Sequence, residues 1–280
     1  MAAAARVVPG GRAVPDGGER VTPVHPEFVP DPSQSRAEMA ALQRRVAEAA
    51  RFEDDLPFDP AAVSLATDAT LAGERPLVAG VDQAFLDGRA VSAVVCLRGG
   101  EVVERTHAVT DLEIPYIPGL LSFREGGPIL AAFERLESDP DLVVFDGSGR
   151  IHYRQAGLAT HLGVVLDVPS VGVAKSLLCG RVEGDVSGRP TGWRAPVRAD
   201  DDVDAPEGTV LGYAYQSRQY DSNPVINPLY VSPGHRTSAG TAGDVVEPYS
   251  MIPVGPPVLY HISLFHPPCR TCACAIRSPS

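Results

Sequence analysis

The chain has 280 residues, of which 44% are hydrophobic and 6% aromatic, and its formal net charge is −11. This length is enough for a sizeable core in one large domain or two small ones. The acidic balance excludes a protein that coats nucleic acid by bulk charge, and no hydrophobic run reaches the length of a membrane span. Residues 1–12 lack a signal-like apolar segment, so we expect a cytoplasmic protein without a membrane partner.

The basic residues are unusual in type. Of the 24 basic residues, Lys175 alone is lysine and the others are arginine. An acidic, lysine-poor surface fits a high-salt interior, where charges are screened within a few Å. Affinity for phosphate must then come from local contacts or metals, so the acidic total does not exclude a nucleic-acid substrate.

In the first 76 residues, the sequence predicts a single helix and little other regular structure. Residues 1–34 are rich in Ala, Gly and Pro without periodicity, and we expect a flexible leader. Ser35 and Glu38 form a capping-box pattern that predicts a helix through about Arg51. Residues 53–76 are acidic and contain prolines, which is typical of a connecting segment.

The next part predicts an antiparallel meander, because strand-like runs are separated by the turn dipeptides Asp87-Gly88 and Gly99-Gly100. Strands and helices then alternate. The expected strands are Val78–Leu86, Val91–Leu97, Val102–Val109, Leu142–Asp146, Ser170–Ala174, Thr209–Gln216 and Leu229–Val231. The expected helices are Gly127–Leu136, Gln155–Leu162 and one after Arg236. This order predicts an α/β fold with a ribonuclease-H-like mixed sheet, an antiparallel meander followed by parallel strands, flanked by helices.

Two aspartates stand at the ends of apolar strands, Asp82 after Leu77–Val81 and Asp146 after Leu142–Phe145. A continuous apolar run of this kind indicates a strand covered on both faces. A carboxylate there is costly without a cation or hydrogen-bond donors, and two would repel each other. A shared Mg²⁺, which prefers oxygen ligands, relieves both problems. The alternative is that each aspartate simply begins the next loop or caps a helix.

Three further residues suit the same chemistry. Glu125 stands before an expected helix, where a helix-dipole role is the alternative. Lys175 ends an apolar strand, and its ammonium could neutralise a phosphate or a leaving group. His235 lies between a strand and a helix and could position or deprotonate a water. With the two aspartates, these residues suggest a metal-dependent phosphodiesterase.

The chain resembles the endonuclease V family, the deoxyinosine 3′-endonucleases of DNA repair, in an archaeal high-salt form. Six segments match in the family's order: Val78–Asp82, Pro115–Glu125, Phe145–Gly149, Gly157–Gly163, Gly172–Lys175 and Ser232–Arg236. Departures include Gln83, where a small or apolar residue is common, and Tyr153, where proline is usual.

The resemblance implies a role for each matching residue. Asp82, Asp146 and Glu125 would be the metal ligands, with Mg²⁺ as cofactor and Mn²⁺ as a substitute. His235 would be the fourth catalytic position, and Lys175 would lie near the reacting phosphate. The DNA contacts would be a wedge and glycine backbone groups: Pro115, Tyr116, Ile117, Pro118, Gly119, Gly147 and Gly149.

The domain division follows from the same matches, with a leader at 1–34, an endonuclease V catalytic domain at 35–246 and an atypical tail at 247–280. The tail carries His261, His266, Cys269, Cys272 and Cys274, ligand types that suit zinc. Their spacing is irregular, and the alternative is a replaced or frame-shifted tail without a selected function.

The resemblance implies Mg²⁺-dependent cleavage of the second phosphodiester 3′ to deoxyinosine, in double- or single-stranded DNA, leaving 3′-hydroxyl and 5′-phosphate ends. A catalytically impaired protein that binds the lesion and an inosine-specific ribonuclease are the alternatives. We expect a monomer.

Overall fold

The computed structural model of the chain describes residues 21–63, 75–217 and 228–250. Within these ranges the helices are α1 (Arg36–Ala49), α2 (Leu121–Phe133), α3 (Leu158–Leu166) and α4 (Ala239–Ser250), with short 3-10 helices η1 (Pro26–Phe28) and η2 (Pro60–Ala62). The strands are β1 (Leu77–Leu86), β2 (Arg89–Arg98), β3 (Glu101–Asp111), β4 (Leu142–Asp146), β5 (Ser170–Ala174), β6 (Arg181–Val182), β7 (Arg194–Arg198), β8 (Val210–Tyr215) and β9 (Leu229–Pro233).

The described strands form one mixed sheet in the order β3-β2-β1-β4-β5-β9-β8-β7-β6. The meander β1-β2-β3 is antiparallel, as the turn dipeptides predict, and Asp87 and Gly88 take positive φ values of 48° and 78°. Strands β1, β4 and β5 are parallel neighbours, whereas β9 runs antiparallel to β5. The carboxyl ends of β1, β4 and β5 therefore lie at one edge of the sheet.

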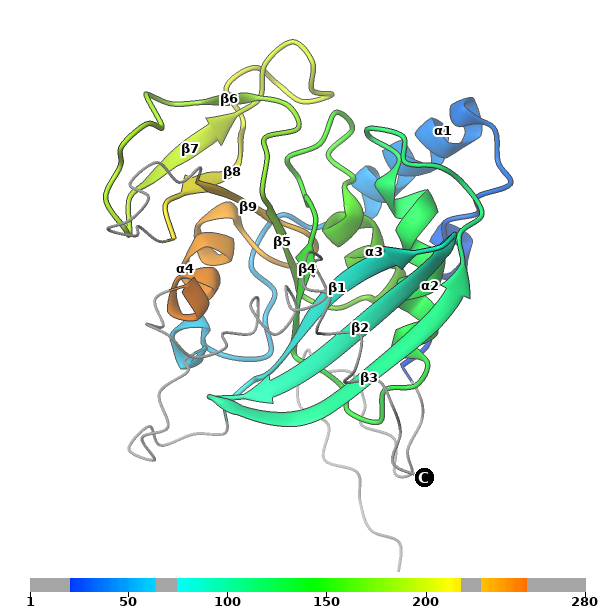
Figure 1. Cartoon of the computed structure of the whole chain (residues 1–280). Coiled ribbons are helices and arrows are strands. Elements are labelled where there is room, and N and C mark those ends of the chain that lie inside the picture. Colours follow the sequence, from blue (N-terminus) through cyan, green and yellow to red (C-terminus); the bar gives the residue numbers. More distant parts are fainter. Residues whose placement is uncertain (1–20, 64–74, 218–227, 251–280) are drawn as a thin grey trace, which may run out of the picture.

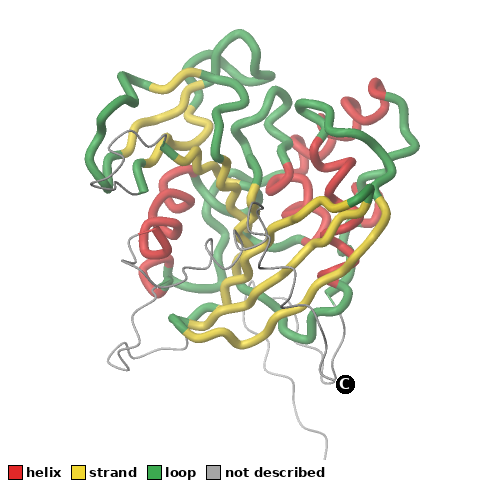
Figure 2. Tube along the Cα trace, in the orientation of Figure 1, coloured by secondary structure: helices red, strands yellow, loops and turns green. Residues whose placement is uncertain are grey.

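Helices cover both faces of the central strands (Figures 1 and 2). On one face α2 and α3 pack against the odd-numbered side chains of β1 and β4, including Val81 and Phe145. On the other face α4 packs against a second core that includes Val78, Val144 and Val173. The mixed sheet flanked by helices confirms the predicted fold class. No helix in the described ranges has the length and apolar character needed to cross a membrane.

Residues 21–34 differ from the expected flexible leader, because they pack on the domain. The Val24 amide donates to the Val165 carbonyl at 2.8 Å, and Val21 is only 8% exposed. Phe28 lies against the core beneath α1. The apolar residues in this segment have no helical or strand period, so their burial could not be recognised from the pattern. The predicted capping box of α1, by contrast, is present between Ser35 and Glu38.

Helix α2 begins at Leu121, six residues before the helix expected at Gly127. The Gly126-Gly127-Pro128 run is unfavourable in a helix, and it misplaced the expected boundary. Burial outweighs that propensity, since Phe123, Ile129 and Phe133 fill the core. Glu125 consequently lies inside the helix and not before it.

Two further differences concern the later part of the chain. The short strands β6 and β7 were not predicted, and they extend the sheet beyond β8. Helix α4 was predicted after Arg236, and it continues to Ser250, past the boundary expected at residue 246.

A buried histidine joins the N-terminal segment to the helical layer. The His161 side chain on α3 is fully buried, with Nδ1 2.9 Å from the Ser122 hydroxyl and Nε2 2.8 Å from the Phe28 carbonyl. Because the carbonyl only accepts, Nε2 carries the proton and the ring is neutral. Burial lowers the pKa of His161 from 6.5 to about 4.

We expect His161 to make folding sensitive to acid. Its folded pKa lies below its ordinary value, so the unfolded chain binds more protons between these values and stability falls as pH drops from about 6.5 towards 4. Between pH 7 and pH 5 this one group should remove about 2 kcal/mol of unfolding free energy. Urea unfolding of the wild type and of His161→Gln at both pH values isolates the contribution of His161, because the contributions of the other titrating groups cancel in the difference between the two proteins. A difference that does not change with pH would contradict the assignment.

Candidate metal centre and DNA-contact loop

The register of the sheet brings Asp82 and Asp146 together. Val81 pairs with Phe145 across the parallel strands β1 and β4, so the next residue on each strand is an aspartate. Side chains alternate between faces, and both aspartates share the face that carries Val78 and Val144. The two carboxylates therefore lie on neighbouring strands, at the same end and on the same face.

Lys175 lies beside this pair, directly after β5. Its Nζ is 2.8 Å from Asp146 Oδ2. Burial opposes the charged form of Lys175, but the charge of Asp146 and this hydrogen bond outweigh it and raise the lysine pKa. The ammonium of Lys175, the only lysine in the sequence, thus lies at the carboxyl ends of the parallel strands.

Glu125 approaches the pair from α2 and is 7% exposed. Burial is the main cause that raises its pKa to about 8; Arg124 opposes this rise, and the charges of Asp146 and Asp82 add to it. Asp82 is 6% exposed, and burial followed by the charge of Asp146 raises its pKa to about 7. The three carboxylates therefore lie close enough to repel one another.

The donor set fits a hard divalent cation. All three candidate ligands offer carboxylate oxygens, the type that Mg²⁺ prefers, and burial together with the neighbouring carboxylates raises the pKa values of Asp82 and Glu125. No group of three or more metal-binding side chains is gathered within ligand distance among the described residues. Mg²⁺ commonly uses only one or two carboxylates and completes its shell with water, and two neighbouring aspartates are compatible with that chemistry.

The predicted wedge is the loop between β3 and α2. Tyr116 is 59% exposed, and its neighbours Pro115 and Pro118 are exposed as well. Ile117 instead packs against a small core formed by α1 and the start of α2. The loop thus presents Tyr116 to solvent, while the partly buried Ile117 packs against the domain.

Gly119 ends the loop, and two buried side chains hold its carbonyl. Gln43 Nε2 on α1 donates to it at 2.9 Å, and His152 Nε2 donates at 3.0 Å. Gly119 has φ +76°, and a side chain there would crowd the ring of Tyr153. Sequence reasoning missed Gln43; a polar residue within the apolar face of an amphipathic helix was the available signal.

The amides of Gly147 and Gly149, two of the expected DNA contacts, form hydrogen bonds within the protein. The Gly147 amide donates to the Val173 carbonyl at 3.0 Å, and the Gly149 amide donates to the Ser232 hydroxyl at 2.9 Å. A side chain on Gly149 would collide with the carbonyl of Pro233. Both amides are therefore occupied within the protein, and these glycines permit close packing of β4, β5 and β9.

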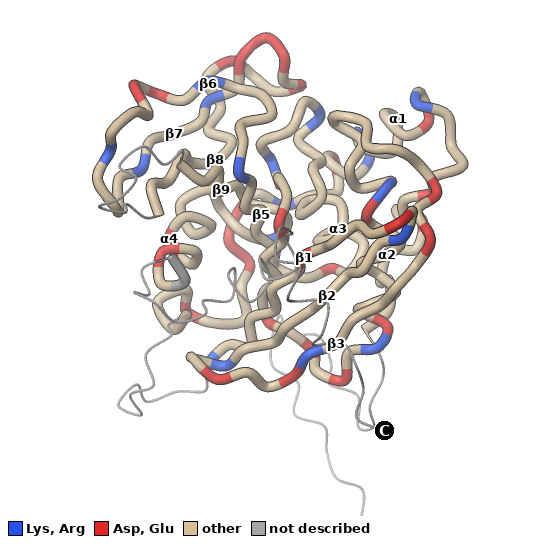
Figure 3. Tube along the Cα trace, in the orientation of Figure 1, with Lys and Arg blue, Asp and Glu red and all other residues tan. Residues whose placement is uncertain are grey.

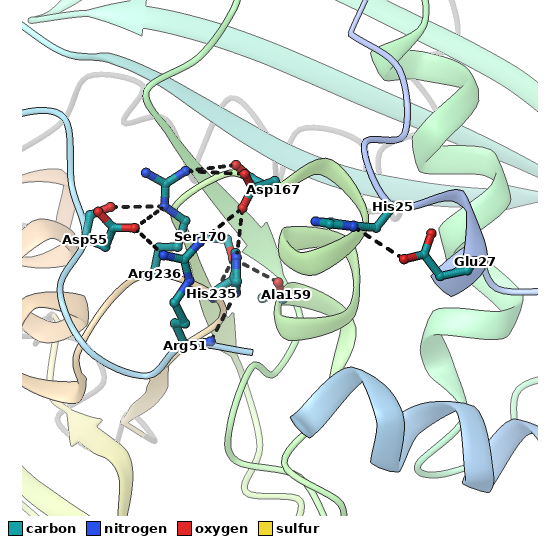
Figure 4. Close-up of polar contacts among 9 residues, drawn as sticks. All are labelled: His25, Glu27, Arg51, Asp55, Ala159, Asp167, Ser170, His235 and Arg236. Carbon is teal, nitrogen blue, oxygen red and sulfur yellow. Dashed lines mark hydrogen bonds and ion pairs between the residues drawn. The ribbon is translucent and has the colours of Figure 1, made fainter. Parts of the chain in front are cut away.

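His235 does not join the acidic site. Val171 at the start of β5 pairs with Pro233 at the end of β9, so His235 follows the opposite end of β5 from Lys175. His235 Nδ1 accepts from the Arg51 amide and Nε2 donates to Asp167 Oδ1, both at 3.2 Å (Figure 4). Burial lowers its pKa to about 4. With both ring nitrogens engaged, His235 tethers the segment after α1; it does not activate water at the carboxylates.

The tether continues through charged pairs on the same side of the domain. Arg236 Nε lies 3.1 Å from Asp55 Oδ2, and Arg51 pairs with Asp55 at 2.7 Å (Figure 4). These contacts join the segment before β1 to the β9–α4 connection. The zinc-site residues considered in the tail, His261 to Cys274, lie outside the described residues.

Acidic residues occur along the loops near β6 and along the outer strand β3 (Figure 3). This distribution matches the acidic composition, and in this view the trace of the described residues shows no dense run of basic residues. Contacts to phosphate must therefore be local, as the composition predicts.

A ribonuclease-H-like sheet with carboxylates at the ends of adjacent parallel strands is typical of a class of metal-dependent nucleases. Comparisons with known proteins are more specific. Residues 62–254 match the family model for Endonuclease V. Endonuclease V of Haloarcula marismortui is 61% identical over 242 residues, covering 81% of this chain and 89% of the relative. That of Natronomonas pharaonis is 62% identical over 221 residues, covering 79% and 86%.

Solved structures agree with this match. The crystal structure of Streptomyces avermitilis endonuclease V has a TM-score of 0.61 at 31% identity, covering 81% of this chain and 87% of that one. The Ciona intestinalis enzyme, crystallised with a 24mer DNA containing an inosine followed by a ribo-adenosine, has a TM-score of 0.57 at 24% identity, covering 76% and 88%. The latter likeness shows the fold alone. The chain belongs to the endonuclease V family, in its haloarchaeal form, and is a nuclease that hydrolyses DNA.

We expect Asp82→Asn to stabilise the metal-free protein at pH 8. The folded pKa of Asp82 is about 7, above its ordinary 3.8, so its contribution to stability is present at low pH and lost as pH rises towards and beyond 7. Removing the charge should raise the unfolding free energy by on the order of 2 kcal/mol. Chemical denaturation in EDTA at constant KCl measures this.

The exposed turn variant Asp87→Asn is the matched control and should leave stability near the wild-type value. Adding Mg²⁺ should stabilise the wild type and not Asp82→Asn, because only the wild type binds the ion in its folded state. A loss of stability in Asp82→Asn at pH 8 would show that the carboxylate is already compensated.

Proposed function

We propose that this protein hydrolyses the second phosphodiester bond 3′ to deoxyinosine in DNA, with Mg²⁺ as cofactor and Mn²⁺ as a substitute, and leaves 3′-hydroxyl and 5′-phosphate ends. The observation that carries the proposal is the placement of Asp82 and Asp146 on neighbouring parallel strands, with Lys175 Nζ 2.8 Å from Asp146. Family membership supplies the reaction class.

Asp82 and Asp146 would hold the divalent metal through carboxylate oxygens, and Glu125 would complete the acidic set. When bound, the metal supplies a polarised phosphate and a water that ionises near neutral pH. The charge that the metal brings also favours the ionised forms of Asp82 and Glu125 at neutral pH, against the burial that raises their pKa values.

Lys175 would act on the phosphate. Its ammonium lies at the carboxyl edge beside Asp146, where a phosphodiester drawn to the acidic site would pass. A compact ammonium there stabilises the negative charge that develops on the phosphate and the leaving oxygen. His235 has no part in this step, because its ring nitrogens bind Arg51 and Asp167 at the other end of β5.

The lesion would be read beside the wedge loop. Exposed Tyr116 can stack in the space left when the damaged base turns out of the helix, and the anchored Ile117 keeps the ordering cost of the loop low. Turning out is least costly for a weakly paired base such as inosine. A protein of the same fold binds inosine-containing DNA, which supports this substrate.

We further propose that the protein acts as a monomer on double- or single-stranded DNA in the cytoplasm. The local character of its phosphate contacts suits a high-salt interior, because they do not depend on bulk charge.

The direct test is a nicking assay on a duplex with one deoxyinosine at high KCl. Mg²⁺-dependent cutting at the second phosphodiester 3′ to the lesion should be lost in Asp82→Ala and Asp146→Ala, by a factor of about 10³ or more, since each removes an oxygen ligand. The exposed acid Asp244, paired only with Arg194, gives the control Asp244→Ala, which should cut normally. Normal cutting by both active-site variants would refute the metal assignment.

The same assay separates the alternatives. Inosine-specific binding without cutting in Mg²⁺ or Mn²⁺ would indicate a catalytically impaired binding protein. Equal or faster cutting of a matched RNA oligonucleotide would indicate an inosine-specific ribonuclease, since the 2′-hydroxyl distinguishes the two substrates.

Tyr116→Ala should weaken binding to deoxyinosine DNA about ten-fold, because one aromatic stack on a base contributes about 1–3 kcal/mol. Tyr116→Phe keeps the ring and should bind like the wild type. Fluorescence anisotropy with Ca²⁺ in place of Mg²⁺ measures the affinity. Wild-type affinity in Tyr116→Ala would show that the exposed ring is not the wedge.

A further inference from the structure

Gln83 forms hydrogen bonds with the Asp82 carboxylate and with the backbone carbonyl of Glu125. Asp82 and Glu125 are the two buried acids whose pKa values are raised. Its backbone amide donates to Asp82 Oδ1 at 2.8 Å. Its side-chain Nε2 donates to the Glu125 carbonyl at 3.1 Å and to the Ser92 hydroxyl at 2.5 Å. The amide orientation follows from the chemistry, because the Glu125 carbonyl can only accept. One residue of β1 therefore bonds to β2, to α2 and to the neighbouring carboxylate.

The turn of α2 that carries Glu125 needs such support. The N-cap residue Leu120 makes no side-chain cap hydrogen bond. Gly126 and Gly127 add no side-chain stiffness, and Pro128 lacks the N–H that would bond to the carbonyl four residues earlier. This turn is thus weakly held by its own helix. It nevertheless carries a carboxylate that burial and the charges of Asp146 and Asp82 disfavour.

The bond from Gln83 reaches the Glu125 carbonyl, next to the Arg124 carbonyl that Pro128 leaves without its helical donor. Ser122 ties the first turn of α2 to His161 on α3, on the helical side. Gln83 ties the following turn to the sheet, next to Asp82. The other end of the Gln83 amide, Oε1, is buried and accepts no hydrogen bond from the described residues. The contribution of this side chain therefore comes from its donor end.

We propose that Gln83 is a positioning residue that sets Glu125 relative to Asp82 and thereby sets the affinity of the acidic site for its divalent metal. This inference rests on the proposed function only in that the acidic site binds a metal. It does not depend on which base is recognised or which bond is cut. Polar groups that orient metal ligands change metal affinity when they are removed, although they never touch the metal.

The test compares Gln83→Met with the wild type. Methionine keeps the length and the strand position but removes both side-chain donors. Isothermal titration with Mg²⁺ should show about ten-fold weaker binding. Amide hydrogen exchange should be faster in peptides that cover residues 121–133 and unchanged in those that cover α3. Raised Mg²⁺ should restore most of the single-turnover cutting rate, because the ligands themselves are intact.

Two variants separate positioning from general packing. Ser92→Ala removes only the β2 partner of Gln83 and should keep metal affinity near that of the wild type. Gln83→Asn keeps the amide group on a side chain one methylene shorter, so it should lose the hydrogen bond to the Glu125 carbonyl. Its affinity for Mg²⁺ should therefore fall to that of Gln83→Met, and it provides a second test if the methionine variant folds poorly. Thermal unfolding monitors the fold of each variant.

The results have separate readings. If Gln83→Met and Gln83→Asn bind Mg²⁺ like the wild type, or if Ser92→Ala weakens binding as much as they do, the positioning role is refuted while the proposed function stands. If the wild type itself binds neither Mg²⁺ nor Mn²⁺, the proposed function fails and this inference fails with it.

Discussion

Burying Asp82 and Glu125 beside Asp146 brings three carboxylates together, two of them largely removed from water. Burial and mutual charge raise the pKa values of Asp82 and Glu125 to about 7 and 8. Lys175 offsets part of this charge through Asp146. Such an arrangement lowers the stability of the fold, and it persists because the surrounding packing determines the positions of the strands and of α2. A divalent cation at this position would compensate the excess negative charge of these carboxylates.

The remainder of the scaffold holds these groups in place. The parallel pairing of β4 with β5 brings Lys175, directly after β5, to Asp146 at the end of β4. Helix α1 supports the loop after β3 through Gln43, so Tyr116 stays exposed on an anchored loop. The ion pairs around His235 join the segment before β1 to the start of α4. The polar contacts at His235 therefore hold structural segments together, whereas the contact at Asp146 positions Lys175 beside the carboxylates.

Much of the site was predictable because its signals are local. Apolar runs and turn dipeptides identified the strands, and an acidic residue at the end of an apolar strand indicated a candidate functional site. The parallel register then follows from the fold class and brings Asp82 next to Asp146. Positions that depend on several elements were not predictable. His235 matched a family segment, but only the β5–β9 register shows that it lies at the wrong end of the strand.

The sequence by itself determined the fold class, the strand-end carboxylates and the lysine, because these features depend on residue type and period within single elements. The wedge loop was expected only from the family resemblance. Tertiary structure alone decided which groups meet. It extended α2 back from Gly127 to Leu121, since burial of Phe123 and Ile129 outweighs local helix propensity. It also engaged the Gly147 and Gly149 amides within the sheet and placed Gln83 between Asp82 and Glu125. Such contacts join residues far apart in the chain, and no local pattern encodes them.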